Sequence, residues 1–126
     1  MPLYWTIDSK GELVTVVAEG DVTRADADAY LDAMEGAGVL GYRKLFDGMA
    51  GTLVMDGEDL LAIGVRLRSF HRSPVGALAM VLPDDRLEPV ARILGILASA
   101  DRPIRLFKNL PSAQRWIERL APGPAG

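Results

Sequence analysis

Four carboxylates and one lysine directly follow the predicted strands of this sequence. They are Asp21, Asp47, Asp84, Asp85 and Lys108. Because parallel sheets bind ligands beyond the carboxyl ends of their strands, this acidic rim is a candidate site for a divalent cation or for phosphoryl chemistry. Aspartates that follow strands also cap the next helix, which accounts for Asp21, Asp84 and Asp85 without any ligand. We therefore expect no bound metal or cofactor, and the acidic rim stays open as an alternative.

Other residues with catalytic chemistry are scarce. The sequence has no cysteine and a single histidine, His71, so thiolate nucleophiles and multi-histidine metal sites are excluded. It also lacks the G-x-S-x-G motif of a serine nucleophile elbow. We expect His71 to lie at the end of a helix and to interact with its last carbonyls. The sequence thus predicts a protein that is not an enzyme.

One glycine-rich motif spells the dinucleotide fingerprint G-x-G-x-x-G, from Gly36 to Gly41. That fingerprint binds pyrophosphate only where it leaves a strand and opens a helix. Here the motif follows a helical pattern and enters a strand. We therefore interpret its glycines as a helix C-cap and a tight loop.

Composition narrows the possible partners. The 126 residues include 14 basic and 17 acidic side chains, a net charge of −3, which makes nucleic acid an unfavourable partner. The longest wholly apolar stretch, Gly76 to Leu82, is far too short to span a membrane. The N-terminus shows no signal-peptide pattern, so we expect a cytoplasmic protein.

The elements that would position these residues alternate along the chain. Two runs, Leu3–Ile7 and Leu13–Ala18, flank a polar turn and predict an antiparallel hairpin. Strand-like runs at Leu13–Ala18, Lys44–Phe46, Ala77–Leu82 and Ile104–Phe107 are each followed by a helical pattern. This alternation predicts an α/β fold in which the hairpin feeds four βα turns. The result is a mixed, mostly parallel five-stranded sheet with four helices, as one domain over residues 1–121 with a flexible tail at 122–126.

Helix start signals agree with the apolar periodicity. Thr23-x-x-Asp26, Asp56-x-x-Asp59 and Asp85-x-x-Glu88 each place a capping side chain three residues before an acid. The last helix carries the apolar stripe Ala113, Trp116, Ile117 and Leu120, so we expect Trp116 to be largely buried against the last strand.

Three stretches resemble the SpoIIAA-like branch of the STAS superfamily, in particular its small bacterial STAS-like or CRAL-TRIO-like members. They are Val17 to Thr23, Arg43 to Asp47, and Ile104–Phe107 with the later Ala113-x-x-Trp116-Ile117. The resemblance implies the fold given above and a non-catalytic regulatory or protein-interaction module. The alternative, by analogy with CRAL-TRIO folds, is a small carrier or sensor that binds a lipid or other hydrophobic molecule.

One stretch departs from the superfamily pattern. Its anti-sigma-factor antagonists carry a phosphorylatable serine in an Asp-Ser-Ser-Gly motif at the start of the second helix. The corresponding residues here are Asp56-Gly57-Glu58-Asp59, and Thr52 is the only hydroxyl between residues 47 and 59. We therefore predict that this protein has no phosphorylation switch at that position.

A surplus of aliphatic residues lies beside the core stripes of the second and third predicted helices. These residues are Leu61, Val65, Pro89, Ile93 and Ile96. Two such stripes on neighbouring helices indicate a contact surface. We expect this surface to bind another protein or a second copy of the chain, as a two-fold dimer.

Overall fold

The computed structural model describes residues 2–69, 76–83, 85 and 104–120. Its elements follow in the order β1 (Leu3–Asp8), β2 (Leu13–Thr23), α1 (Arg24–Gly36), β3 (Arg43–Val54), α2 (Gly57–Ser69), β4 (Leu78–Val81), β5 (Ile104–Phe107) and α4 (Leu110–Arg119). The strands form one sheet in the order β1-β2-β3-β4-β5, in which β1 is antiparallel to β2 and every other pair is parallel. The predicted hairpin and mixed five-stranded sheet are confirmed.

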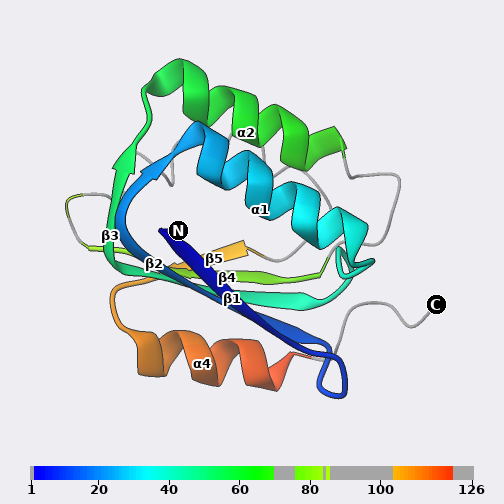
Figure 1. Cartoon of the computed structure of the whole chain (residues 1–126). Helices are drawn as coiled ribbons and strands as arrows, with labels where there is room; N and C mark the ends of the chain where they lie inside the picture. Colours follow the sequence, from blue (N-terminus) through cyan, green and yellow to red (C-terminus); the bar gives the residue numbers. More distant parts are fainter. Residues whose placement is uncertain (1, 70–75, 84, 86–103, 121–126) are drawn as a thin grey trace.

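Helices cover both faces of the sheet. Figure 1 shows α1 and α2 on one face and α4 on the other. The described residues thus contain three helices rather than the four predicted from the sequence. The remaining predicted helix, with its Asp85-x-x-Glu88 start signal, falls on residues of which all but Asp85 lie outside the described ranges.

Two apolar clusters hold these layers together. One lies between the sheet and α1 and is built on the fully buried Val14, Val16 and Met34. The other lies between the sheet and α4 and is built on Val81, Ala113 and Ile117. Because side chains alternate along a strand, the two faces of β2 and β3 supply different clusters.

The start of α1 is capped as predicted. The Thr23 hydroxyl accepts a hydrogen bond from the Asp26 N–H at 3.3 Å, and the Thr23 N–H donates to the Asp26 carboxylate at 2.9 Å. The Thr23 hydroxyl also donates to this carboxylate at 2.9 Å. The bonds that the carboxylate accepts, first from the Thr23 N–H and then from the Thr23 hydroxyl, hold the pKa of Asp26 below its ordinary value. Helix α4 is capped instead by Asn109, whose side chain accepts from the Ser112 N–H at 2.9 Å.

Strands β2 and β3 run further than the sequence predicted. The prediction ended them at Ala18 and Phe46, whereas they continue to Thr23 and Val54 and remain paired to each other. Their register shifts between Val17 and Glu19, which marks a bulge. The two strands curl towards the first turns of α1 and α2 (Figure 1).

Two glycines make this extension possible. Gly20 has a φ of +77°, a left-handed conformation that costs glycine little. Gly51 packs against Ala18, and a Cβ at residue 51 would lie 2.7 Å from the Ala18 Cβ. Gly20, which follows the predicted strand end at Ala18, therefore lies inside a bulged strand.

Two buried cations anchor the start of β3. The Arg43 guanidinium donates to the carbonyls of Ile117 at 2.9 Å, Leu120 at 3.0 Å and Gly11 at 2.6 Å. It thereby satisfies the end of α4, where carbonyls lack helical partners. The Lys44 ammonium donates to the carbonyls of Val39, Leu40 and Tyr42, at 2.9, 2.9 and 2.7 Å. Both side chains close loops against the sheet, a role that the sequence analysis missed.

Trp116 is partly buried and packs against the α4 cluster, in line with the prediction that it lies largely buried against the last strand. Ala113 and Ile117 occupy the centre of the α4 contact and are fully buried. Trp116 lies at the margin, where its ring centroid is 5.7 Å from that of Phe107 in β5. The predicted contact with the last strand is therefore present, although part of the ring stays in solvent.

Candidate functional site

Helix α2 begins where the sequence departs from the phosphorylation motif. Asp56 and Asp59 cap it reciprocally, since the Asp59 N–H donates to the Asp56 carboxylate at 2.8 Å and the Asp56 N–H to the Asp59 carboxylate at 3.2 Å. Glu58 adds a third carboxylate in the first turn. Thr52 lies upstream in β3, paired with Asp21 of β2. The first turn of α2 is therefore closed by its own carboxylates and presents no hydroxyl group.

Ion pairs fix the inner side of α2 against α1. The Arg66 guanidinium contacts the Asp28 carboxylate at 3.1 Å and also pairs with Asp32. Its hydrogen bonds to Asp32, and secondarily to Asp28, raise the pKa of Arg66 above its ordinary value. Near the first turns, Arg24 of α1 lies 3.8 Å from Asp59 of α2. These contacts hold the two helices side by side.

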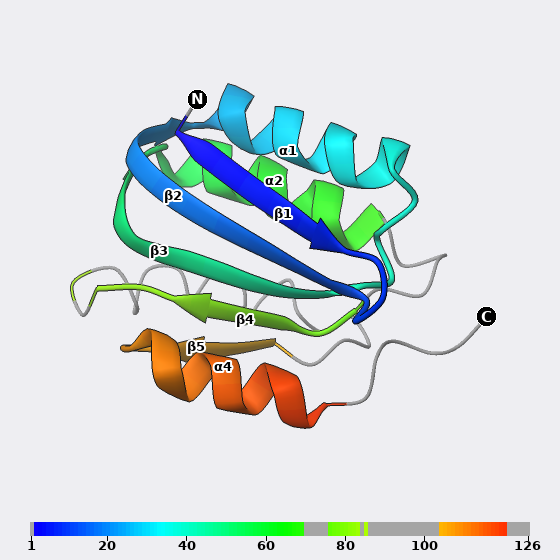
Figure 2. The ribbon, with the colours of Figure 1, turned by 60° about the horizontal axis from the view of Figure 1, so that its bottom comes forward.

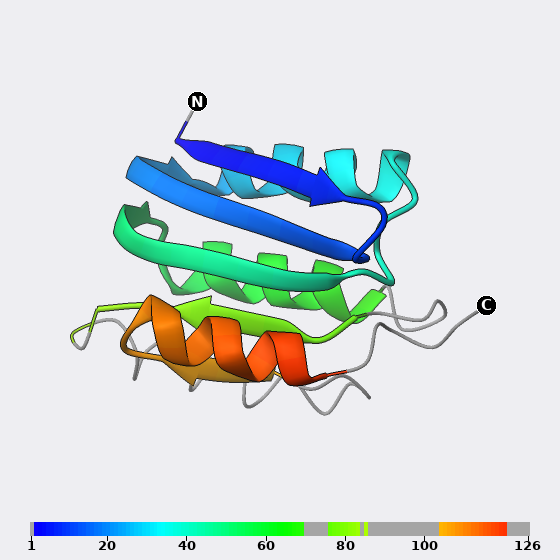
Figure 3. The same ribbon diagram turned by 90° about the horizontal axis from the view of Figure 1, so that it is seen from below.

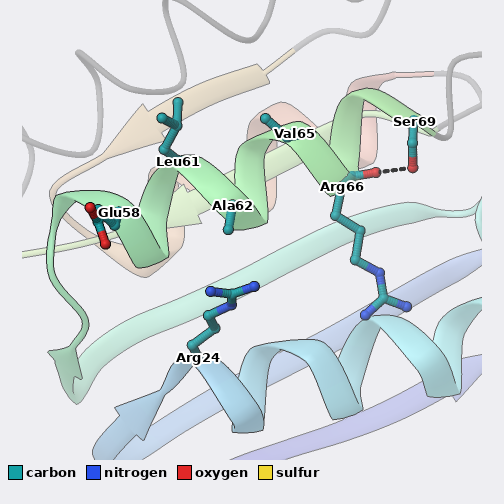
Figure 4. Close-up of a pocket in the computed structure, with 7 residues that line it drawn as sticks. All are labelled: Arg24, Glu58, Leu61, Ala62, Val65, Arg66 and Ser69. Atoms are coloured by element: carbon teal, nitrogen blue, oxygen red, sulfur yellow. Dashed lines mark hydrogen bonds between the residues drawn. The ribbon is translucent and has the colours of Figure 1, made fainter.

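The outer side of α2 is apolar and exposed. Leu61 and Val65 lie one turn apart with exposed fractions of 52% and 57%, and in Figure 4 both point away from α1. They border an open groove that is lined by Arg24, Glu58, Leu61, Ala62, Val65, Arg66 and Ser69. The Ser69 hydroxyl donates to the Arg66 carbonyl at 2.6 Å, within its own helix. This arrangement is suited to binding through apolar contact with a charged margin.

Of the predicted contact residues, the structure thus places Leu61 and Val65 on one exposed face. Pro89, Ile93 and Ile96 lie outside the described residues, as does His71. The two-fold dimer through the second and third predicted helices stays a prediction.

The acidic rim is dispersed along the strands. Asp21 lies within β2, exposed and opposite Thr52. Asp47 lies within β3, between Val17 of β2 and Val81 of β4, and accepts from the Met49 N–H at 3.2 Å. The prediction that both leave the ends of strands was wrong, because β2 and β3 continue past them.

The three other residues of the acidic rim are Asp84, Asp85 and Lys108. Asp85 and Lys108 are exposed, Lys108 directly after β5, and Asp84 lies outside the described ranges. Within the part of the chain that the structure describes, no three carboxylates or histidines gather closely enough to hold a metal ion.

The glycine motif lies where the sequence predicted. Helix α1 ends at Gly36, and Gly38 adopts a φ of +71° in the loop that leads to β3. The Ala37 N–H closes the helix by donating to the Ala33 carbonyl at 2.9 Å. The motif therefore stands at the end of a helix, where the carbonyl end of the helix dipole repels phosphate.

In the described residues, no helix is long and apolar enough to cross a membrane. No protein-family model matches the sequence, and no curated protein matches it either. Among solved structures, the chain matches an uncharacterised protein of the DUF3478 family, with a SpoIIAA-like fold, from Shewanella loihica PV-4. The TM-score is 0.63 at 14% identity, and the match covers 91% of this chain and 93% of that one. At this identity the likeness concerns the backbone, and together with the strand order it shows that the chain has a SpoIIAA-like fold.

Proposed function

We propose that this chain is a non-catalytic protein-interaction module of STAS type that binds a partner protein through the outer face of α2. The observation that carries the proposal is the exposed pair Leu61 and Val65. They lie on the helix that begins at the superfamily's phosphorylation position. Burial of each side chain would contribute about 1–2 kcal/mol before the cost of association is subtracted.

The surroundings of this pair favour a protein as the partner. Glu58 lies one turn before Leu61, and Arg24 and Arg66 border the side that faces α1. An apolar centre with charged residues at its margin is the usual composition of a protein interface. Because Asp56 and Asp59 close the helix start in place of a switch serine, the proposed binding is constitutive.

A photo-crosslinking residue introduced at position 61 tests the proposal in cells. We expect one specific protein to be crosslinked at position 61, and no protein to be crosslinked at the same level from position 112, on α4. The identified protein is then titrated with the purified chain. Leu61→Glu should weaken its binding at least about 10-fold, because a charge would enter a desolvated contact.

Met49→Glu is the matched control, because Met49 of β3 is 48% exposed and lies off α2. Binding that Leu61→Glu and Met49→Glu reduce equally would contradict the assignment to α2. Circular dichroism of both variants checks that the fold is intact.

A carrier of lipids would bury most of its ligand. The groove beside α2 is open to solvent (Figure 4), so it gives the carrier alternative no support. Native mass spectrometry of the purified chain distinguishes the two functions, since a carrier would retain an apolar small molecule.

A further inference from the structure

Strand β1 forms an outer edge of the sheet, since it stands first in the strand order. The Glu19 N–H donates to the Pro2 carbonyl at 2.8 Å, so Pro2 and Glu19 form a hydrogen-bonded pair in the antiparallel register. Such pairs alternate along an antiparallel ladder, which makes Leu3, Trp5 and Ile7 the residues that direct their main-chain groups away from β2. Within the described part of the chain, no strand pairs with these groups.

This edge lacks the features that usually prevent strands from pairing. Between Leu3 and Ile7 the strand contains no charged residue and no proline, whereas the opposite edge strand, β5, carries the exposed Arg105 at its middle. Tyr4 and Ile7 are 52% and 36% exposed. Uncharged apolar edges readily add another strand.

The space beside β1 is also open on the α4 side of the sheet. Figure 3, which views the molecule from that side, shows α4 across β4 and β5 and away from β1. In Figure 2 the strand lies along the margin of the sheet, beneath α1. The Trp5 ring of β1 contacts the Tyr30 ring of α1, and the two ring centroids are 5.5 Å apart. A strand added to the edge would therefore meet no helix on the α4 side.

We propose that two copies of this chain pair through their β1 edges, antiparallel and about a two-fold axis at Trp5. In this register Leu3 lies opposite the second copy's Ile7, and all three outward-facing residues of each strand are used. The pairing forms about six main-chain hydrogen bonds. It unites the two sheets into one and leaves the α2 faces free, so it is independent of the function proposed above.

Side chains support self-pairing in this register. Tyr4 lies opposite the second copy's Thr6, an aromatic and β-branched pair that stabilises antiparallel strands, and the symmetry forms it twice. No like charges face each other, because the nearest charge, Asp8, lies beyond the paired residues. An extended segment of another protein would form the same main-chain bonds but would not match these side chains by symmetry.

The interface is small. Strand pairing over this length buries less than the roughly 800 Å² per partner that is typical of stable complexes. We therefore expect a dimer that dissociates with a Kd on the order of tens to hundreds of micromolar.

Analytical ultracentrifugation over a concentration series measures this association. The weight-average mass should rise towards twice that of the monomer. Ile7→Pro removes an outward-facing N–H from each copy and spares the bonds of Thr6 and Asp8 to β2, so it should weaken the dimer about 30-fold. Ile7→Ala, which keeps the N–H, is the matched control and should still dimerise.

Other outcomes would overturn the proposal. A wild type that stays monomeric at high micromolar concentration leaves the edge unpaired or open to another protein's segment. A dimer that is lost in Leu61→Glu but kept in Ile7→Pro assigns self-association to the helices instead.

Should Ile7→Pro fail to fold, hydrogen exchange of the wild type decides the matter. The amides of Leu3, Trp5 and Ile7 should exchange more slowly at high concentration, and unchanged exchange in a dimeric sample would refute the pairing.

Discussion

Arg43→Met tests whether a buried cation holds the end of α4 to the sheet. Arg43 is only 9% exposed and donates to three main-chain carbonyls from two distant parts of the chain. Methionine keeps most of the apolar stem and removes every donor. The variant therefore isolates the hydrogen bonds from the packing of the side chain.

The expected loss follows from the surroundings of each carbonyl. The hydrogen bond to Ile117 is buried, so its unpaired carbonyl costs about 1–3 kcal/mol. The carbonyls of Leu120 and Gly11 are partly buried and can regain water, so each costs about 1 kcal/mol. Removing the guanidinium also relieves its desolvation, including that of its Nε, which is buried without a partner. We expect a net loss of about 2–4 kcal/mol in the free energy of unfolding.

Urea unfolding followed by circular dichroism measures this loss, and an unchanged m-value would show that the unfolded state is unaffected. Arg119→Met is the matched control, because Arg119 is exposed in the last turn of α4. It should change the free energy of unfolding by less than about 0.5 kcal/mol. A loss below about 1 kcal/mol in Arg43→Met, or an equal loss in both variants, would refute the anchoring role.

Trp116→Ala should lower the free energy of unfolding by about 2–3 kcal/mol in the same assay, less than a fully buried aromatic would cost. A loss below about 1 kcal/mol would mean that α4 docks without this ring. The Asp26 carboxylate, with its lowered pKa, should stabilise the fold above its unfolded pKa and lose that effect as pH falls through the folded pKa. Thr23→Val should raise the Asp26 pKa in an NMR titration and cost about 1 kcal/mol of stability, and an unmoved pKa would contradict the cap. A serine kinase of the anti-sigma type should leave residues 47–59 unphosphorylated, and phosphate on Thr52 that alters partner binding would restore the switch mechanism.

Local signals predicted the fold because they agreed with one another. Apolar periodicity and the capping pairs at Thr23 and Asp56 placed α1 and α2, and the structure contains the hydrogen bonds that each pair implies. A polar turn between two short apolar runs likewise predicted the hairpin. These features depend on residues close together in the chain, which sequence patterns report well.

Features that depend on distant residues were not predicted. The predicted strand ended at Ala18, but β2 continues because Gly51, far along the chain, has no side chain to collide with Ala18. This error placed Asp21 and Asp47 after the ends of their strands, whereas both lie inside them. The role of Arg43 depends on carbonyls at the other end of the chain. Nothing in the pattern around Arg43 and Lys44 distinguishes buried cations from exposed ones.

The two proposed surfaces lie in a definite relation to each other. Residues that face each other across an antiparallel pair project to the same side of the sheet. Pairing through β1 would therefore place the α1–α2 layers of both copies on one side and both α4 helices on the other. Figure 3 shows α2 behind β3 and β4, and α1 behind β1 and β2. The two α2 faces would then stand apart, each beyond its own α1, and both would be open to partners.

This arrangement would strengthen the binding of a partner that presents two copies of its epitope. Once the first copy is bound, the second copy meets the other α2 face at a higher effective concentration. Because the monomer retains the same α2 face, Ile7→Pro should keep its affinity for a single epitope and lose only this gain.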